Sequence, residues 1–168
     1  SNQVAGFTTD HIAALNTSLV RALNTAALAA LDTLQVVALS SAHVAALTSQ
    51  QVAKMTTAQI AAIESDDIAA LNSVHISAFN SNQAAALTTD QVGQINTTAL
   101  RALSTQNVAA LGSDQLAALS SAQVAVLTSG QAAVLNTLQV GGLETADIGA
   151  LNTAAVRALR SEEHTSEL

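Results

Sequence analysis

Three histidines recur at a fixed interval, and imidazole is a common ligand for transition metals. His11, His43 and His75 are separated from one another by 32 residues. In a stack of short helices that interval corresponds to roughly 17 to 20 Å, whereas the ligand atoms of one zinc ion lie within about 2.1 Å of it. We therefore expect these histidines to replace glutamine as surface or capping polar residues, and we predict no metal site.

Carboxylates are the second group that could do chemistry, and they form one cluster at Glu64, Asp66 and Asp67. General acid–base catalysis needs a carboxylate pair with shifted pKa values in a cleft that excludes water. A carboxylate at a helix start has a simpler role, because it interacts favourably with the positive end of the helix dipole. We interpret these residues as helix-start charges, with weak calcium binding at residues 64–67 as the alternative.

The other ingredients of an enzyme site are not found in the sequence. Serine and threonine are abundant, but they do not form a Gly-x-Ser-x-Gly motif or a Ser/His/Asp constellation. Gly141-Gly142 is interpreted as a packing variant of an Ala-Ala pair, and the chain has no cysteine for a disulfide or a zinc-thiolate site. The sequence therefore predicts no enzyme, with no catalytic residue, no cofactor-binding residue and no metal ligand.

The composition shows what kind of core must hold these residues. Of the 168 residues, 49% are hydrophobic, 10% are charged and only 1% are aromatic. A globular domain ordinarily has about 25% charged residues, and disordered chains are poor in apolar residues. We expect an ordered chain whose core is built from small aliphatic side chains.

An eight-residue repeat, here called an octad, organises residues 1–159. Counted from Ser1, position seven is Leu or another large apolar residue in every octad. Position four is aliphatic, with Ala84 and Ala132 as the small exceptions, and position one is always Ser or Thr. Position three favours Gln, positions five and six favour Ala, and position eight favours Asn, Thr or Ser. The consensus is Thr-x-Gln-Val-Ala-Ala-Leu-Asn, repeated about twenty times in a single array.

An octad fits short helices better than one long helix or a β-strand. One continuous helix would need 4.0 residues per turn instead of 3.6, so the leucine row would circle the helix. In a strand, positions four and seven would face opposite sides. In a short helix the same two positions share a face, and alanine between them is the best helix former. The sequence predicts an all-α solenoid, with a β-solenoid as the alternative fold.

Each predicted helix has its own start signal. In residues 87–92, Thr88 can be the N-cap, Gln91 its capping-box partner, and Leu87 and Val92 a hydrophobic staple. Thr89 is the competing cap, so octad positions eight and one both remain candidates. Either choice gives one helix of about six residues per octad, which is too short to persist alone and must be stabilised by stacking.

We expect these helices to pair as antiparallel hairpins and the hairpins to stack into an elongated rod. Valine and leucine would fill the centre, and alanine at positions five and six would let the helices approach closely. Ten hairpins at about 8 to 9 Å each would give a rod of roughly 80 to 90 Å.

Residues 160–168, RSEEHTSEL, do not follow the octad. They are similar to a translated sequencing-library adapter, so we expect a non-native tail that is disordered or fraying. The array also begins in mid-repeat without a methionine. We therefore interpret residues 1–159 as a metagenomic piece of a longer protein, with further repeats beside it in the same chain.

The octads resemble the TTxQVAAL-type repeats of large bacterial secreted and surface proteins, over all of residues 1–159. That resemblance implies a structural spacer at the cell surface or outside the cell. The alternative is a binding module that uses its rows of Ser, Thr, Asn and Gln to recognise a protein, a glycan or an ice surface.

Nucleic acid and membrane lipid are not expected partners. Residues 31–41, LDTLQVVALSS, resemble the opening of a TAL-effector repeat, but the similarity covers one helix and lacks the base-reading loop. Residues 1–159 have four basic residues against nine acidic ones, and phosphate backbones repel such a charge. The apolar residues recur in short groups, so we expect no membrane insertion by this segment.

Overall fold

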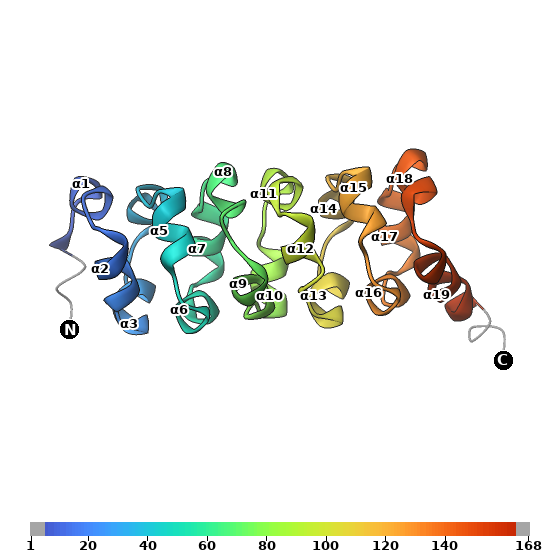
Figure 1. Cartoon of the computed structure of the whole chain (residues 1–168), viewed down its shortest axis with the longest axis horizontal. Helices are drawn as coiled ribbons and strands as arrows, with labels where there is room; N and C mark the ends of the chain where they lie inside the picture. The colour runs from blue at the N-terminus through green and yellow to red at the C-terminus, as the bar shows by residue number, and fades with distance from the viewer. Residues whose placement is uncertain (1–5, 164–168) are drawn as a thin grey trace.

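The computed structural model describes residues 6–163, and their side chains through residue 159. All regular structure within residues 6–163 is helical, with one helix per octad and no strand (Figure 1). This confirms the all-α solenoid of short helices. The helices are α1 Thr9–Ala13, α2 Thr17–Ala22, α3 Thr25–Ala29, α4 Thr33–Val37, α5 Ser41–Ala46, α6 Ser49–Lys54, α7 Thr57–Ala62, α8 Ser65–Ile68, α9 Ser73–Ser77, α10 Ser81–Ala85, α11 Thr89–Gln94, α12 Thr97–Leu100, α13 Thr105–Ala109, α14 Ser113–Ala117, α15 Ser121–Ala125, α16 Ser129–Ala133, α17 Thr137–Gly142, α18 Thr145–Ala150 and α19 Thr153–Glu163.

Octad position eight is the helix N-cap, which decides between the two candidates. Before α11, Thr88 has an extended backbone, and its hydroxyl accepts a hydrogen bond from the Gln91 amide at 3.2 Å. The Gln91 side-chain oxygen accepts one from the Thr88 amide at 2.9 Å, which completes the predicted capping box. Thr89 is the first helical residue.

Helices α1 to α18 end at octad positions four to six, without a special backbone conformation. The Ile95 amide donates to the Val92 carbonyl at 3.3 Å, a three-residue spacing that tightens the last turn. Ile95 and the following cap Asn96 are then both extended. Within the described residues no φ is positive, so two extended residues and a good N-cap are enough to interrupt the helix.

The helices do not pair as antiparallel hairpins, and that part of the prediction is wrong. Each helix from α1 to α16 packs against the helix three further along the chain. The coils contact each other at a recurring separation of 28 residues, or three and a half octads, so one coil of the solenoid takes between three and four helices. Figure 1 shows α1, α8, α11, α15 and α18 along one edge. A coil of this size surrounds a central core, whereas two short antiparallel helices would leave one of the two apolar rows uncovered.

The wider coil makes the rod shorter than predicted. Side chains of one coil contact the preceding coil at a recurring separation of 28 residues. With about six coils in the array and roughly 8 to 10 Å between stacked helices, the rod is on the order of 50 to 60 Å long.

The core consists of positions four and seven of every octad. Val44 and Leu47 in one octad, and Val124 and Leu127 in another, are at most 3% exposed. Alanine is arranged differently from the prediction, because position five mostly faces solvent and position six is mostly half-buried. Close approach is required at Gly142, where an added Cβ would lie 2.9 Å from the Ser113 carbonyl oxygen of α14.

The last helix extends beyond the expected end of the array. Helix α19 continues through Glu163, four residues past the predicted boundary at residue 159. It packs against α16, as the three-helix spacing requires. Residues 164–168, the remainder of the predicted non-native tail, lie outside the described residues.

Candidate functional site

The buried glutamine side chains at octad position three join each coil to the one before it. Gln59 is 2% exposed, and its Nε2 donates to the carbonyls of Leu28 and Leu31 at 2.9 and 2.8 Å. Its Oε1 accepts from the Thr56 amide at 2.9 Å, so one side chain both caps its own helix and binds the preceding coil. We call this row of contacts the glutamine ladder. The same contacts recur at Gln51, Gln83, Gln91, Gln115, Gln123, Gln131 and Gln139.

Two of the three predicted histidines are members of this ladder. His43 Nε2 lies 2.6 Å from the Leu15 carbonyl, and His75 Nε2 lies 2.8 Å from the Leu47 carbonyl. The predicted replacement of glutamine and the capping role are confirmed. The expectation of a surface position is wrong for both, because His43 and His75 are buried.

His75 is held in one neutral form by its contacts. Its Nδ1 accepts from the Asn72 amide at 3.3 Å, so the proton must be on Nε2, which donates to the Leu47 carbonyl. Burial lowers the pKa of His75 below its ordinary value, and the hydrogen bond to Leu47 partly opposes that shift.

The histidines do not converge on a metal. His11 is exposed at the first helix, where its Nδ1 accepts from the Thr8 amide at 3.2 Å. His43 and His75 each bind a carbonyl in a different coil. Among the described residues, no group of three histidine, cysteine or acidic side chains could hold a metal ion.

Asparagine takes over the ladder where position three is apolar. Ala99 has no side-chain donor, and Asn96, at position eight of the preceding octad, donates from Nδ2 to the Leu71 carbonyl at 3.0 Å. Asn152 does the same beside Ala155, reaching the Leu127 carbonyl at 2.8 Å. At both places the asparagine Oδ1 also caps the helix that follows it.

The glutamine ladder is interrupted at Asp67 and Asp147, which lack an amide donor. Both are buried at position three, and each accepts a hydrogen bond from a serine hydroxyl of the preceding coil, Ser41 and Ser121 respectively. The cap before each is a glutamate without a side-chain capping bond. These two octads are the places where the coils are joined by an acceptor instead of a donor.

The predicted acidic cluster at residues 64–67 is divided between two environments. Glu64 and Asp66 are exposed, whereas Asp67 is buried against Ser41. Asp66 and Asp67 lie in the first turn of α8, which confirms the helix-start interpretation. Within the described residues, these side chains do not form a group that could hold a metal ion, so the geometry lends the calcium alternative no support.

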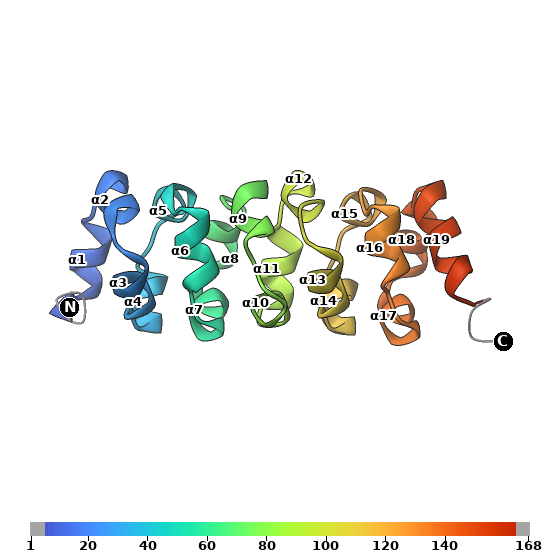
Figure 2. The same ribbon diagram turned by 90° about the horizontal axis from the view of Figure 1, so that it is seen from below.

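Exposed acidic side chains recur at the starts of helices that pack on one another. Asp66, Asp90 and Asp114 occupy the same position in α8, α11 and α14, which pack on one another in that order. Helices α1, α8, α11 and α18, all with acidic side chains at their starts, lie along the upper edge in Figure 1. Helices α2 and α12, with Arg21 and Arg101, instead lie along the upper edge in Figure 2, a quarter turn away.

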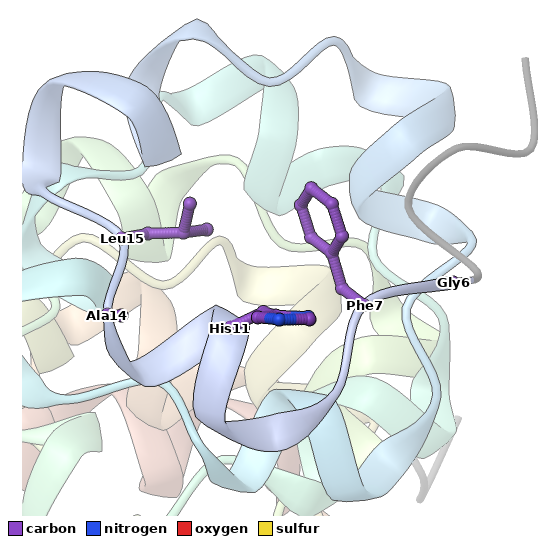
Figure 3. Close-up of a pocket in the computed structure, with 5 residues that line it drawn as sticks. All are labelled: Gly6, Phe7, His11, Ala14 and Leu15. Carbon is purple, nitrogen blue, oxygen red and sulfur yellow. The ribbon is translucent and has the colours of Figure 1, made fainter.

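An open pocket of about 530 Å³ lies at the N-terminal end of the rod (Figure 3). It is lined by Gly6, Phe7, His11, Ala14 and Leu15, and the Phe7 and His11 rings meet edge to face with centroids 6.0 Å apart. These are octad positions that the preceding coil covers elsewhere in the array. The pocket is therefore the exposed end of the core.

Sequence reasoning missed the ladder, although the sequence has a signal for it. Position three is apolar in four octads, at Leu19, Ala27, Ala99 and Ala155, and the octad before each of them ends with Asn at position eight. This pairing of an apolar position three with an asparagine three residues before it indicates that one of the two positions must supply an amide donor. Its target is a carbonyl 25 to 31 residues away, and the octad pattern alone does not identify it.

No helix within the described residues is long and apolar enough to cross a membrane. No curated protein and no solved structure matches the chain. The family model described as the ALTTAQ repeat matches at residues 20–49, 60–97 and 94–121, which together make up more than half of the chain. The chain therefore belongs to the ALTTAQ repeat family.

Proposed function

We propose that this repeat segment is a structural spacer within a larger bacterial protein, secreted or exposed at the cell surface, and that it has no catalytic role. The observation that carries the proposal is the core that runs through the whole described array, with ladder contacts along most of it. Buried donors at position three meet carbonyls 28 residues earlier from His43 in α5 to Gln139 in α17, except at Asp67 and Ala99. Such a stack sets a fixed distance between whatever lies at its two ends.

The hydrogen bonds of the buried polar side chains support the proposal that the rod is stiff. No buried side-chain nitrogen or oxygen within the described residues lacks a hydrogen-bond partner. Each coil is thus fixed to the next by apolar packing and by hydrogen bonds. Bending the rod would break these hydrogen bonds and leave buried carbonyls without a partner, which costs free energy. The family match supports the repeat architecture, and the resemblance to surface-protein repeats supports the location.

Distance measurements between spin labels test the spacer. The chain has no cysteine, so Ser18→Cys and Ala154→Cys, both at exposed positions near the two ends, give a clean label pair. A single narrow distance distribution is expected. A broad distribution would contradict a rigid spacer.

A deletion that respects the packing serves as the matched comparison. Removing residues 89–112 deletes α11, α12 and α13 and preserves both the octad phase and the three-helix packing. The distance should fall by one coil, roughly 8 to 10 Å, and the distribution should stay narrow. An unchanged distance would show that the number of repeats does not set the distance between the two ends, and would contradict the spacer.

The second candidate is a binding module for a protein, glycan or ice surface. The row of exposed Asp66, Asp90 and Asp114 on successively packed helices favours it, because an inert rod has no need of such a pattern. A glycan array, a thermal-hysteresis assay and binding to a cationic peptide at low and high salt would test this candidate. Binding that is lost in an Asp66→Asn, Asp90→Asn and Asp114→Asn variant would support the module over the spacer.

The foreign origin of residues 160–168 is a separate proposal, supported by their departure from the octad. Recovering the gene from its source DNA tests it. Continuation of the TTxQVAAL pattern in place of RSEEHTSEL is the expected result, whereas the same nine residues in the native gene would overturn it.

A further inference from the structure

Residues 40–47 comprise helix α5, the cap before it and the leucine after it, and we call them the α5 joint. We propose that this joint is sensitive to acid: protonation of the buried His43 and His75 releases it from the coils on both sides. The joint lies in the interior of the array, and its contacts are the same whether or not the rod serves as a spacer.

The α5 joint is linked to both neighbouring coils by imidazole. His43 Nε2 lies 2.6 Å from the Leu15 carbonyl of the preceding coil. The Leu47 carbonyl lies 2.8 Å from Nε2 of His75, which belongs to the following coil. Where glutamine or asparagine makes the corresponding contact, the donor is an amide, which does not titrate.

The remaining contact of the α5 joint also involves a titratable group. The Ser41 hydroxyl donates to the carboxylate of Asp67 in α8. Among the described residues, the joint has no other side-chain hydrogen bond to another coil. The next octad differs, because amides of Gln51 and Gln83 link it to the coils on its two sides.

Both imidazoles are held in a form that protonation destroys. His43 Nδ1 accepts from the Ser40 amide at 3.2 Å, and His75 Nδ1 accepts from the Asn72 amide at 3.3 Å. A protonated imidazole carries a hydrogen on each nitrogen, so Nδ1–H would face the N–H of the helix cap. The charged form therefore cannot keep both contacts of the neutral form.

Neither imidazole is paired with a group of opposite charge. Helix α5 packs against α2 and α8, its partner carbonyl follows α1, and α9, which carries His75, packs against α6 and α12. Among the described residues, no hydrogen bond or ion pair joins His43 or His75 to a charged or titratable side chain on these elements or at their caps. Those side chains are Asp10, His11, Arg21, Lys54, Glu64, Asp66, Asp67 and Arg101, all exposed except Asp67.

Acid should therefore favour an opened α5 joint. Charging a buried imidazole without a partner costs free energy, and opening lets it reach water. Burial lowers the pKa of His75 in the closed form, whereas an exposed histidine titrates near about 6.5. Lowering the pH from about 7 to about 5 should favour the opened form by roughly 10-fold to 30-fold through His75.

Hydrogen exchange at pH 7 and pH 5 measures this opening, with each rate expressed relative to an unstructured chain at the same pH. Protection of the α5 amides and of the first turn of α9 should fall about tenfold at pH 5. Protection of α11 and α15, which are joined by Gln91 and Gln123, should stay unchanged. An equal fall in all four helices would overturn the proposal, because it would indicate a general effect of acid.

The double variant His43→Gln and His75→Gln removes both titrating donors and keeps the fold, because glutamine is the usual residue of the ladder. The acid-dependent loss of protection in α5 should disappear. The matched control is His11→Gln, at an exposed position, which should keep that loss. Persistence of the loss in the double variant would overturn the proposal, since it would assign the acid sensitivity to other groups.

The variant Gln91→His transfers one imidazole to another coil. There it can accept from the Thr88 amide and donate to the Ile63 carbonyl, which are contacts that Gln91 makes at 2.9 and 2.6 Å. Protection of the first turn of α11 should now fall at pH 5, by less than in α5 because Gln123 still binds the Ile95 carbonyl. An unchanged first turn, in a variant with the helical circular dichroism spectrum of the parent, would refute the proposed mechanism.

Discussion

Octads with glutamine at position three and octads with aspartate there share one backbone and differ in how they join the preceding coil. Gln91 donates from Nε2 to the Ile60 and Ile63 carbonyls at 2.9 and 2.6 Å. Asp67 has nothing to donate, and it accepts from the Ser41 hydroxyl instead. The helices begin at the same place in both, so capping forms the helix and the ladder joins the coils.

The comparison also separates two uses of a buried polar side chain. An amide satisfies the cap and the preceding coil at once, because it has both a donor and an acceptor. A carboxylate can only accept, so the carbonyls at its octad lose their ladder donor. We therefore expect the coil boundaries at Asp67 and Asp147 to be the weakest in the array, and the following variants test that difference.

The largest effect is expected for Gln91→Ala. It leaves the Ile60 and Ile63 carbonyls buried without their donor and the Thr88 amide without its acceptor, at a cost of about 3 kcal/mol in the free energy of unfolding. Urea denaturation followed by circular dichroism measures it. Gln94→Ala, at an exposed position in the same helix, is the control, and equal losses in the two variants would disprove the ladder.

Asn96→Asp should have the next largest effect. The aspartate keeps the cap of α12 but cannot donate to the Leu71 carbonyl, so we expect a loss of about 1 to 2 kcal/mol. Asn80→Asp has the same charge change without a ladder bond to lose. Adding Ala99→Gln to Asn96→Asp should restore stability, and a failure to do so would show that the two positions are not alternative donors.

Asp67→Gln should make the aspartate octad behave like its neighbours. The new amide can reach carbonyls of the preceding coil, at the loss of the Ser41 bond, and we expect a gain of about 1 kcal/mol. The same denaturation assay applies, with Asp66→Gln at the neighbouring exposed position as control. A destabilised Asp67→Gln protein would mean that the serine contact is the stronger join.

The smallest effect concerns the pH dependence contributed by His75. Its pKa is lowered by burial in the folded chain, so the unfolded chain binds a proton first as the pH falls through about 6.5. The His75 contribution to stability should therefore be fully present near neutral pH and decline below it. The His75→Gln variant should lose this contribution to the pH dependence of the free energy of unfolding, measured by urea denaturation at several pH values. Parallel pH profiles for the two proteins would contradict a role of His75 in that dependence.

Thr88 shows how far the local prediction reaches. The helix, its capping box with Gln91 and the core positions Val92 and Ile95 all follow from contacts within one octad, and the structure confirms them. What the octad could not reveal is the 28-residue separation at which Gln91 meets Ile63. The predicted hairpin failed for the same reason, because the number of helices per coil depends on contacts between octads.

His75 marks the same limit for the candidate site. Its replacement of glutamine could be recognised from position three alone, but its burial depends on the Leu47 carbonyl of another coil.

The sequence by itself determined the helices, their caps and the apolar rows, since these depend on propensities and hydrogen bonds within a few residues. Only the tertiary structure decided the three-to-four-helix coil, the burial of position three and the stacking of the helices that carry Asp66, Asp90 and Asp114. Those features depend on which octads become neighbours in space. Because the octads are nearly identical in sequence, the pattern alone does not identify the neighbour of each helix, and packing places it three helices away.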